Sequence, residues 1–416
     1  MKILIKNIKE LFQVREVGIT RLAATEMAYL PSIQNAWLAI ENGIIAGYGT
    51  MDEWTGITDW TDLTVIDAEG KFVFPSFCDS HTHLVYASSR ENEFEDRIKG
   101  LSYEQIAEKG GGILNSAYKL RVASEQELFE SAMQRINEII KTGTGAVEIK
   151  SGYGLDVDSE LKMLRVIKRI KEQSPITVKA TLLAAHAIPI EYKNNRKAYI
   201  KLITDILIPL VKEECLADFI DVFCERNYFT PKETREIIFS GNEAGLRAKI
   251  HVNQFSSNGG IQVAVKENAL SADHLEVMHE KDYEVLKNAN TIPCLLPSCS
   301  FFIGIPYAPA QNLLHNNIPF ALATDYNPGS SPSGSMPFVI SLACIKMKLT
   351  PEQAINAATL NGAYAMNTEN ETGSITIGKK ANLFITKPLF SLAYLPYAFT
   401  ENNIETIILN GKILNS

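Results

Sequence analysis

Short apolar segments alternate with amphipathic segments from about residue 72 to about residue 367. The apolar runs are typical of strands buried on both faces, and the amphipathic segments are typical of helices that cover a parallel sheet. We place the strands at residues 72–81, 145–152, 178–186, 218–225, 247–255, 269–276, 291–298 and 319–325. Eight strands separated by helices predict an α/β fold, a closed (β/α)8 TIM-like barrel.

Several of the predicted helices begin with clear start signals. Ser124 is followed by Glu127 at capping-box spacing, which predicts a helix from residue 125. Thr230 precedes Pro231, a residue favoured at the first helical position. Thr350 begins a segment with the same pattern. These signals support the alternation of strands and helices.

The two ends of the chain, residues 1–71 and 372–416, show short strands separated by turn signals. Asn42-Gly43 and Asn410-Gly411 are typical of two-residue hairpin turns. The simplest arrangement is one small β-sandwich domain formed from both termini. The barrel, residues 72–371, is then a second domain inserted between them.

Composition narrows the environment and the partners. Hydrophobic residues are 46% and charged residues 21% of the chain, as in an ordinary globular protein. A net charge of −8 argues against a nucleic-acid partner, because phosphate binding needs clustered Lys and Arg. No apolar run approaches the roughly 20 residues that span a bilayer, and the first residues do not resemble a signal peptide. The six cysteines form no CxxC pair, so we expect reduced thiols and a cytoplasmic protein.

Polar residues gather where the predicted strands end, which is where barrels of this kind carry their chemistry. His81 and His83 end the first strand and point the same way, because alternate residues of a strand share a face. The other polar residues at strand ends are Lys150, His186, Glu225, His251, Gln254, Asp273, His274 and Asp325. Five of the 7 histidines fall at these ends. Imidazoles with a carboxylate predict a site for zinc or iron with room for a water molecule.

These residues resemble the amidohydrolase superfamily, whose barrels carry HxH on strand one, His on strands five and six, and Asp on strand eight. Further stretches resemble superfamily members that open a five-membered imidazolone ring in histidine degradation. They are "EIKSGYGL" (148–155), "ATLLAAHAIP" (180–189), "IHVNQF" (250–255), "SADHLE" (271–276) and "ATDYNPGSSP" (323–332). The similarity covers most of residues 70–367.

The resemblance implies one divalent or trivalent metal ion, zinc or iron, bound by His81, His83, His251 and Asp325. Binuclear members use a carboxylated lysine from strand four as a bridge. Here strand four ends without a lysine, and Lys150 lies on strand two. We therefore expect a single metal ion, with Lys150 as an internal ion-pair partner.

The resemblance also implies catalytic roles. His274 lies where relatives place the residue that polarises the carbonyl or orients the water. Gln254 takes a position where some relatives have Glu; because an amide cannot shuttle protons, we expect it to hydrogen-bond the substrate ring. Asp325 is then the expected proton shuttle, and His186 is expected to contact substrate. Whether Gln254 or His274 orients the water stays open.

The expected substrate is a small imidazolone ring that carries a propionate, so it needs a cation. Arg90, in the loop after strand one, can bind a carboxylate in bidentate fashion, and Tyr153 adds a hydroxyl. Asn327, Gly329 and Ser330 are expected to hold the polar end of the product.

Two other functions stay open at this point. One is another cyclic amidohydrolase or an aminohydrolase of the cytosine or guanine deaminase type, whose neutral base would need no carboxylate clamp. The other is a non-catalytic barrel used for assembly, but such proteins lose metal ligands. Superfamily members are often dimers, so we expect a homodimer.

Overall fold

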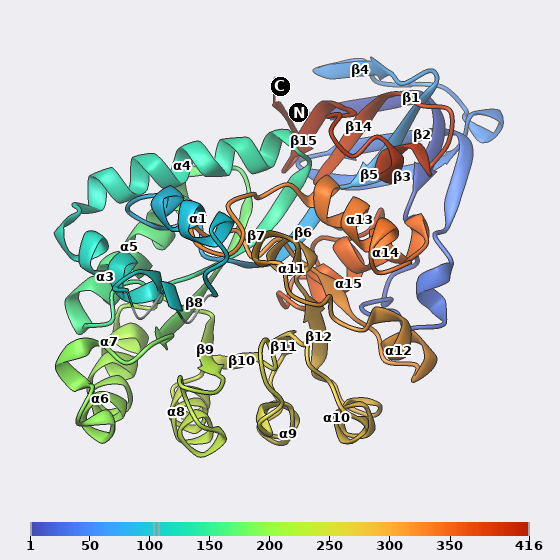
Figure 1. Cartoon of the computed structure of the whole chain (residues 1–416). Coiled ribbons are helices and arrows are strands. Elements are labelled where there is room, and N and C mark those ends of the chain that lie inside the picture. Colours follow the sequence, from blue (N-terminus) through green and yellow to red (C-terminus); the bar gives the residue numbers. More distant parts are fainter. Residues whose placement is uncertain (1, 103–104, 107–108, 415–416) are drawn as a thin grey trace.

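The computed structural model describes residues 2–102, 105–106 and 109–414. Eight parallel strands follow one another around the barrel in chain order (Figure 1). They are β6 (Phe77–Thr82), β7 (Thr144–Lys150), β8 (Thr177–Ala185), β9 (Phe219–Cys224), β10 (Arg247–Val252), β11 (Ser271–His274), β12 (Ile292–Leu295) and β13 (Ala321–Leu322). Each overlaps one predicted strand, so the predicted barrel is confirmed.

The ring closes between β6 and β13 just beyond the end of the short last strand. The amide of Asp325 donates to the carbonyl of His81 at 3.0 Å, and the amide of His83 donates to the carbonyl of Tyr326 at 2.8 Å. Closure therefore brings Asp325 directly beside the two histidines of the first strand.

The prediction of one continuous strand over residues 72–81 was wrong. The chain breaks at Ser76, whose amide donates to Asn382 at 2.9 Å, while the amide of Phe77 donates to Gly143 at 2.9 Å. The first part becomes β5 (Lys71–Pro75) in a second sheet, and the second part becomes β6 in the barrel. The apolar pattern is continuous across this point because both parts are buried.

Helices surround the barrel and cover the strands (Figure 1). The longer ones are α1 (Glu91–Ile98), α3 (Gly112–Val122), α4 (Glu125–Lys141), α5 (Val157–Gln173), α8 (Pro231–Glu243), α13 (Met336–Ile345) and α14 (Pro351–Ala358). Shorter ones are α6 (Arg196–Leu202), α7 (Ile208–Glu213), α9 (Gly260–Lys266), α10 (Glu280–Leu286), α11 (Pro297–Ile303), α12 (Ala310–His315), α15 (Leu360–Tyr364) and α16 (Tyr394–Tyr397). Single turns are η1 (Glu26–Ala28), η2 (Met51–Glu53), η3 (Ile190–Tyr192) and the π-helical η4 (Ile203–Leu207).

The predicted caps are confirmed. Ser124, Thr230 and Thr350 each accept a hydrogen bond from the backbone three residues on, and each forms a complete capping box. No helix among the described residues is both long enough and apolar enough to cross a membrane.

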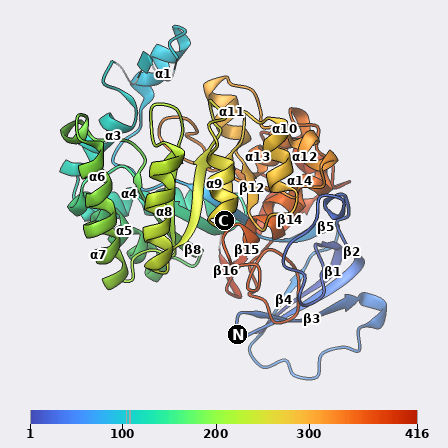
Figure 2. The same ribbon diagram turned by 90° about the horizontal axis from the view of Figure 1, so that it is seen from below.

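Strands from both termini form a mixed sheet at one side of the barrel (Figures 1 and 2). Besides β5 it contains β1 (Lys2–Phe12), β2 (Ser32–Glu41), β3 (Ile44–Thr50), β4 (Leu63–Asp67), β14 (Leu383–Pro388), β15 (Ile404–Leu409) and β16 (Lys412–Leu414). The predicted assembly from both ends is confirmed. Hydrogen bonds link its strands into one continuous sheet, whereas the sequence analysis described it as a sandwich.

Both predicted hairpin turns of this sheet are present. Asn42 and Gly43 have φ of 51° and 84°, and Asn410 and Gly411 have φ of 49° and 69°. Positive φ at both central residues is the geometry of a type I′ turn, which matches the twist of the flanking strands.

Candidate active site

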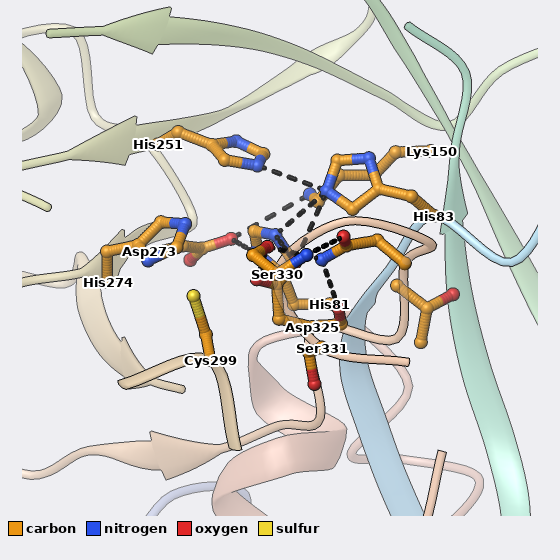
Figure 3. Close-up of polar contacts among 12 residues, drawn as sticks. His81, His83, Lys150, His251, Asp273, His274, Cys299, Asp325, Ser330 and Ser331 are labelled. Carbon is orange, nitrogen blue, oxygen red and sulfur yellow. Dashed lines mark hydrogen bonds and ion pairs between the residues drawn. The ribbon is translucent and has the colours of Figure 1, made fainter. Parts of the chain in front are cut away.

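Four side chains meet at the carboxyl end of the barrel (Figure 3). The Nε2 atom of His83 lies 3.3 Å from Nε2 of both His81 and His251. Asp325 Oδ1 lies 3.6 Å from Nε2 of His81 and of His83. All four residues are at most 3% exposed. These are the four predicted metal ligands, and the structure brings them together.

The opposite nitrogens of two of these rings are held by carboxylates. His81 Nδ1–H donates to Asp273 at 2.6 Å, and His251 Nδ1–H donates to Asp221 at 2.8 Å. Because Nδ1 carries the proton, the Nε2 lone pairs point into the centre of the cluster. Burial is the main cause that lowers the pKa of His81 and His83 well below its ordinary value, so both rings are neutral.

This cluster fits a metal ion. Lone pairs that face one another across 3.3 Å repel unless a cation lies between them. Ligand bonds of about 2.0–2.1 Å in tetrahedral geometry put neighbouring ligand atoms about 3.3–3.4 Å apart. The observed separations therefore match those of ligands around one ion such as zinc or iron.

Lys150 makes the internal ion pairs that the sequence predicted. Its Nζ lies 2.7 Å from Glu148, 2.8 Å from Asp221 and 3.7 Å from Asp273, and the side chain is fully buried. Burial alone would lower the pKa of Lys150, but the three carboxylates raise it above its ordinary value. Sequence reasoning did not assign a role to Asp221 or Glu148. An acidic residue inside an apolar strand is the signal that could have found them.

His274 ends β11 in a left-handed conformation, with φ of 87°. Its Nδ1 lies 3.4 Å from Glu276, which also accepts a hydrogen bond from Ser300 at 3.1 Å. Burial would lower the pKa of His274, but Glu276, Asp325 and Asp273 raise it above its ordinary value. The ring can therefore carry a proton toward the pocket. Sequence reasoning did not single out Glu276.

Gln254, His186 and Tyr153 form other parts of the wall. Gln254 Nε2 donates to the Cys299 sulfur at 3.4 Å. His186 Nδ1–H donates to the Gly152 carbonyl at 3.0 Å. Burial lowers the pKa of His186 to about 3, so the ring is neutral and its Nε2 can accept a hydrogen bond. The Tyr153 ring centroid lies 5.5 Å from that of His186.

Arg90 reaches the pocket across the backbone of Gly329. A Cβ atom at Gly329 would lie 1.2 Å from Arg90 Nη2, so the guanidinium occupies the space of a side chain. Arg90 Nε lies 3.5 Å from the Glu93 carboxylate, and Arg90 is only 6% exposed. A buried guanidinium at a pocket wall suits a carboxylate ligand.

The turn after β13 is held by Asn327. Its Oδ1 accepts the amides of Gly329 at 2.8 Å and Ser330 at 2.7 Å, and its Nδ2 donates to the carbonyl of Asp325 at 2.6 Å. Ser330 Oγ donates to the Asp325 carboxylate at 3.3 Å. The polar groups of this turn thus support Asp325.

One pocket collects nearly all the predicted site residues. It is lined by His83, Arg90, Ile113, Tyr153, His186, Phe223, His251, Gln254, His274, Asp325, Asn327 and Ser330. Of the predicted set, His81 and Gly329 are not among these lining residues. Sequence reasoning missed the apolar walls Ile113 and Phe223, which carry no motif. A parallel barrel with these buried histidines and aspartate defines a metal-binding hydrolase.

Comparisons with known proteins agree with this class. The Amidohydrolase family model matches residues 72–414. The imidazolonepropionase of Christiangramia forsetii is 56% identical over 414 residues and that of Flavobacterium johnsoniae is 55% identical over 411, with 99–100% of each chain covered. The chain belongs to the amidohydrolase family and, within it, to the imidazolonepropionases. The resemblance that the sequence predicted is therefore confirmed.

Solved structures share the fold at low sequence identity. The triazine hydrolase of Arthrobacter aurescens has a TM-score of 0.76 at 13% identity and covers 100% of this chain and 95% of its own. The guanine deaminase of E. coli has a TM-score of 0.72 at 13% identity and covers 100% and 99%. At this identity the likeness concerns the fold alone.

Proposed function

We propose that this pocket hydrolyses the ring C–N amide bond of 4-imidazolone-5-propanoate to N-formimidoyl-L-glutamate. The observation that carries the proposal is the buried cluster of three imidazoles and one carboxylate, which lies beside a buried arginine in one pocket. The cluster supplies a metal site, and the arginine supplies a partner for the propionate.

His81, His83, His251 and Asp325 would hold one ion, zinc or iron. Such an ion supplies Lewis-acid chemistry, because it lowers the pKa of a nearby water molecule and makes it a nucleophile near neutral pH. The neutral rings and the converging Nε2 atoms support this assignment.

Asp325 would move the proton. Burial raises the pKa of its carboxyl, although His274 and His251 oppose that rise, and a base with a raised pKa is better matched to neutral pH. It would accept the proton of the attacking water and deliver it to the ring nitrogen that leaves. Gln254 cannot take this role and would hydrogen-bond the ring.

His274 would donate to the carbonyl oxygen under attack. Glu276 raises the pKa of the ring against the effect of burial, which favours the protonated form that can donate. Charge that develops on the oxygen is then met by a donor already in place, which is an effective form of transition-state stabilisation.

Arg90, Tyr153 and His186 would bind the substrate. Arg90 would pair with the propionate, and the Tyr153 hydroxyl would donate to it. The neutral His186 would accept a ring N–H at Nε2. Ser330, which lines the pocket, would meet the polar end of the product.

The test follows ring loss by ultraviolet absorbance with freshly generated imidazolone propionate and metal-loaded protein. We expect His251→Ala to abolish turnover and lose the metal. Arg90→Ala should raise KM by about 10²-fold with a smaller change in kcat, because a buried charged hydrogen bond is worth about 1.5–3 kcal/mol.

Exposed residues away from the pocket serve as controls. His315 on α12 and Arg165 on α5 are both exposed, and Arg165 pairs with Glu214 at the surface. His315→Ala and Arg165→Ala should therefore behave as wild type. No turnover by wild-type protein with its metal bound would exclude this substrate. Cytosine and guanine would then be the next substrates to assay.

A further inference from the structure

Charged side chains fill the barrel interior beneath the cluster of metal ligands. Lys150, Lys249, Glu148, Asp221 and Asp273 are each at most 1% exposed. Barrels of this kind are usually filled there by layers of aliphatic side chains. A charge at this depth costs several kcal/mol unless it is paired and hydrogen-bonded. Their presence therefore calls for a role beyond packing.

Lys150 occupies the centre of this group. Its Nζ contacts Asp221 at 2.8 Å and Asp273 at 3.7 Å. Asp221 in turn accepts Nδ1–H and the backbone amide of His251, at 2.8 and 3.0 Å. Asp273 accepts Nδ1–H of His81 at 2.6 Å. One ammonium thus bridges the two carboxylates that hold two of the four candidate ligands.

We propose that Lys150 is a positioning residue of the metal centre, which fixes the tautomer and orientation of His81 and His251 through Asp273 and Asp221. This inference rests on the proposed metal site. Without the ammonium, the two aspartates and Glu148 would repel one another. A repelled carboxylate would turn away, and its imidazole would lose the acceptor that directs Nε2 to the ion.

Lys249 offers a matched control in the same interior. It is also fully buried, but its Nζ donates to the backbone carbonyls of Ser80 at 3.0 Å and Ala365 at 2.9 Å. Its nearest carboxylate in the described ion pairs is Glu148, at 3.8 Å. Replacing Lys249 removes a buried charge of the same kind without removing the bridge between Asp221 and Asp273.

The experiment loads the whole protein with Co²⁺ and measures its visible absorption bands and its affinity by chelator competition. We expect Lys150→Met to weaken Co²⁺ binding by about 10–100-fold, as is typical when a group behind a ligand is lost, and to change the bands. Lys249→Met should keep the wild-type bands and a Co²⁺ affinity within about threefold of wild type. This difference between the two variants should hold even if both lower the melting temperature.

A second variant keeps the test decisive if Lys150→Met does not fold. Lys150→Gln retains an amide NH2 donor group without the charge, and it should show an intermediate loss of affinity with altered bands. Wild-type bands and affinity in the folded Lys150 variant would overturn the inference, and so would equal changes in Lys249→Met. If wild-type protein binds no Co²⁺, or His251→Ala binds it as tightly, the proposed metal site itself fails.

Discussion

At the scale of single residues, the absence of a side chain at Gly329 shapes the pocket. Arg90 Nη2 lies 1.2 Å from where a Cβ would be. We expect Gly329→Ala to displace the guanidinium and raise KM by about 10–100-fold, while kcat changes less and metal content is unchanged. Steady-state kinetics with metal analysis would test this.

Gly47→Ala, whose new Cβ would meet Trp37 at an ordinary 3.4 Å, is the control. An unchanged KM in Gly329→Ala would show that Arg90 does not bind the carboxylate.

The same scale shows which site residues a sequence can reveal. His81 and His83 were predictable because a spacing of two places both on one face of a strand. Asp221 was not assigned, because its partners Lys150 and His251 come from other strands and meet it only when the parallel sheet has formed. Asn327 was predicted to hold product, and this stays a prediction. Its side chain also holds its own turn, a role that depends on local geometry and that residue type alone does not give.

At the scale of elements, the loop after β7 is built on one buried carboxylate. Glu160 of α5 accepts the backbone amides of Gly152 at 3.0 Å, Gly154 at 2.8 Å and Leu155 at 2.9 Å. This loop carries Tyr153. We expect Glu160→Gln to lower the free energy of unfolding by about 2–3 kcal/mol, because an amide donor then faces a backbone donor. KM should rise several-fold as Tyr153 loses its support.

Urea unfolding and steady-state kinetics would measure both effects. Glu172→Gln, an exposed substitution on the same helix, should leave stability and KM as in wild type. A Glu160→Gln protein with unchanged stability would show that the loop does not depend on this carboxylate.

Elements also show where a pattern stops being informative. The helices that begin after Ser124, Thr230 and Thr350 were predictable, because a cap is a local signal within four residues. The division of residues 72–81 between two sheets was not, because apolar residues bury equally well in either. Which sheet receives each part is decided by distant hydrogen-bond partners, Asn382 for Ser76 and Gly143 for Phe77.

At the scale of the whole molecule, Lys379 lies where the chain crosses from the barrel back to the terminal sheet. Its Nζ donates to the Thr372 carbonyl at 3.2 Å and to Ser374 Oγ at 2.7 Å, and its own carbonyl accepts the amide of Ile45 in β3 at 2.9 Å. Burial lowers the pKa of Lys379 to about 8. A lysine that can titrate near neutral pH is therefore buried at the junction of the two sheets.

That position links the stability of the molecule to pH. Above about pH 8 the folded protein releases the Lys379 proton, whereas the unfolded chain keeps it up to its ordinary pKa of about 10.4. Because the unfolded chain binds more protons in this window, stability must rise with pH through it. We compare the free energy of unfolding of wild type with that of Lys379→Met at each pH. The difference, wild type minus variant, should be constant below pH 7 and should rise by at most about 3 kcal/mol between pH 8 and 10.4. Urea unfolding at pH 6, 7, 8.5 and 10 measures this difference; a flat or falling difference would mean that the ammonium is not buried at this junction.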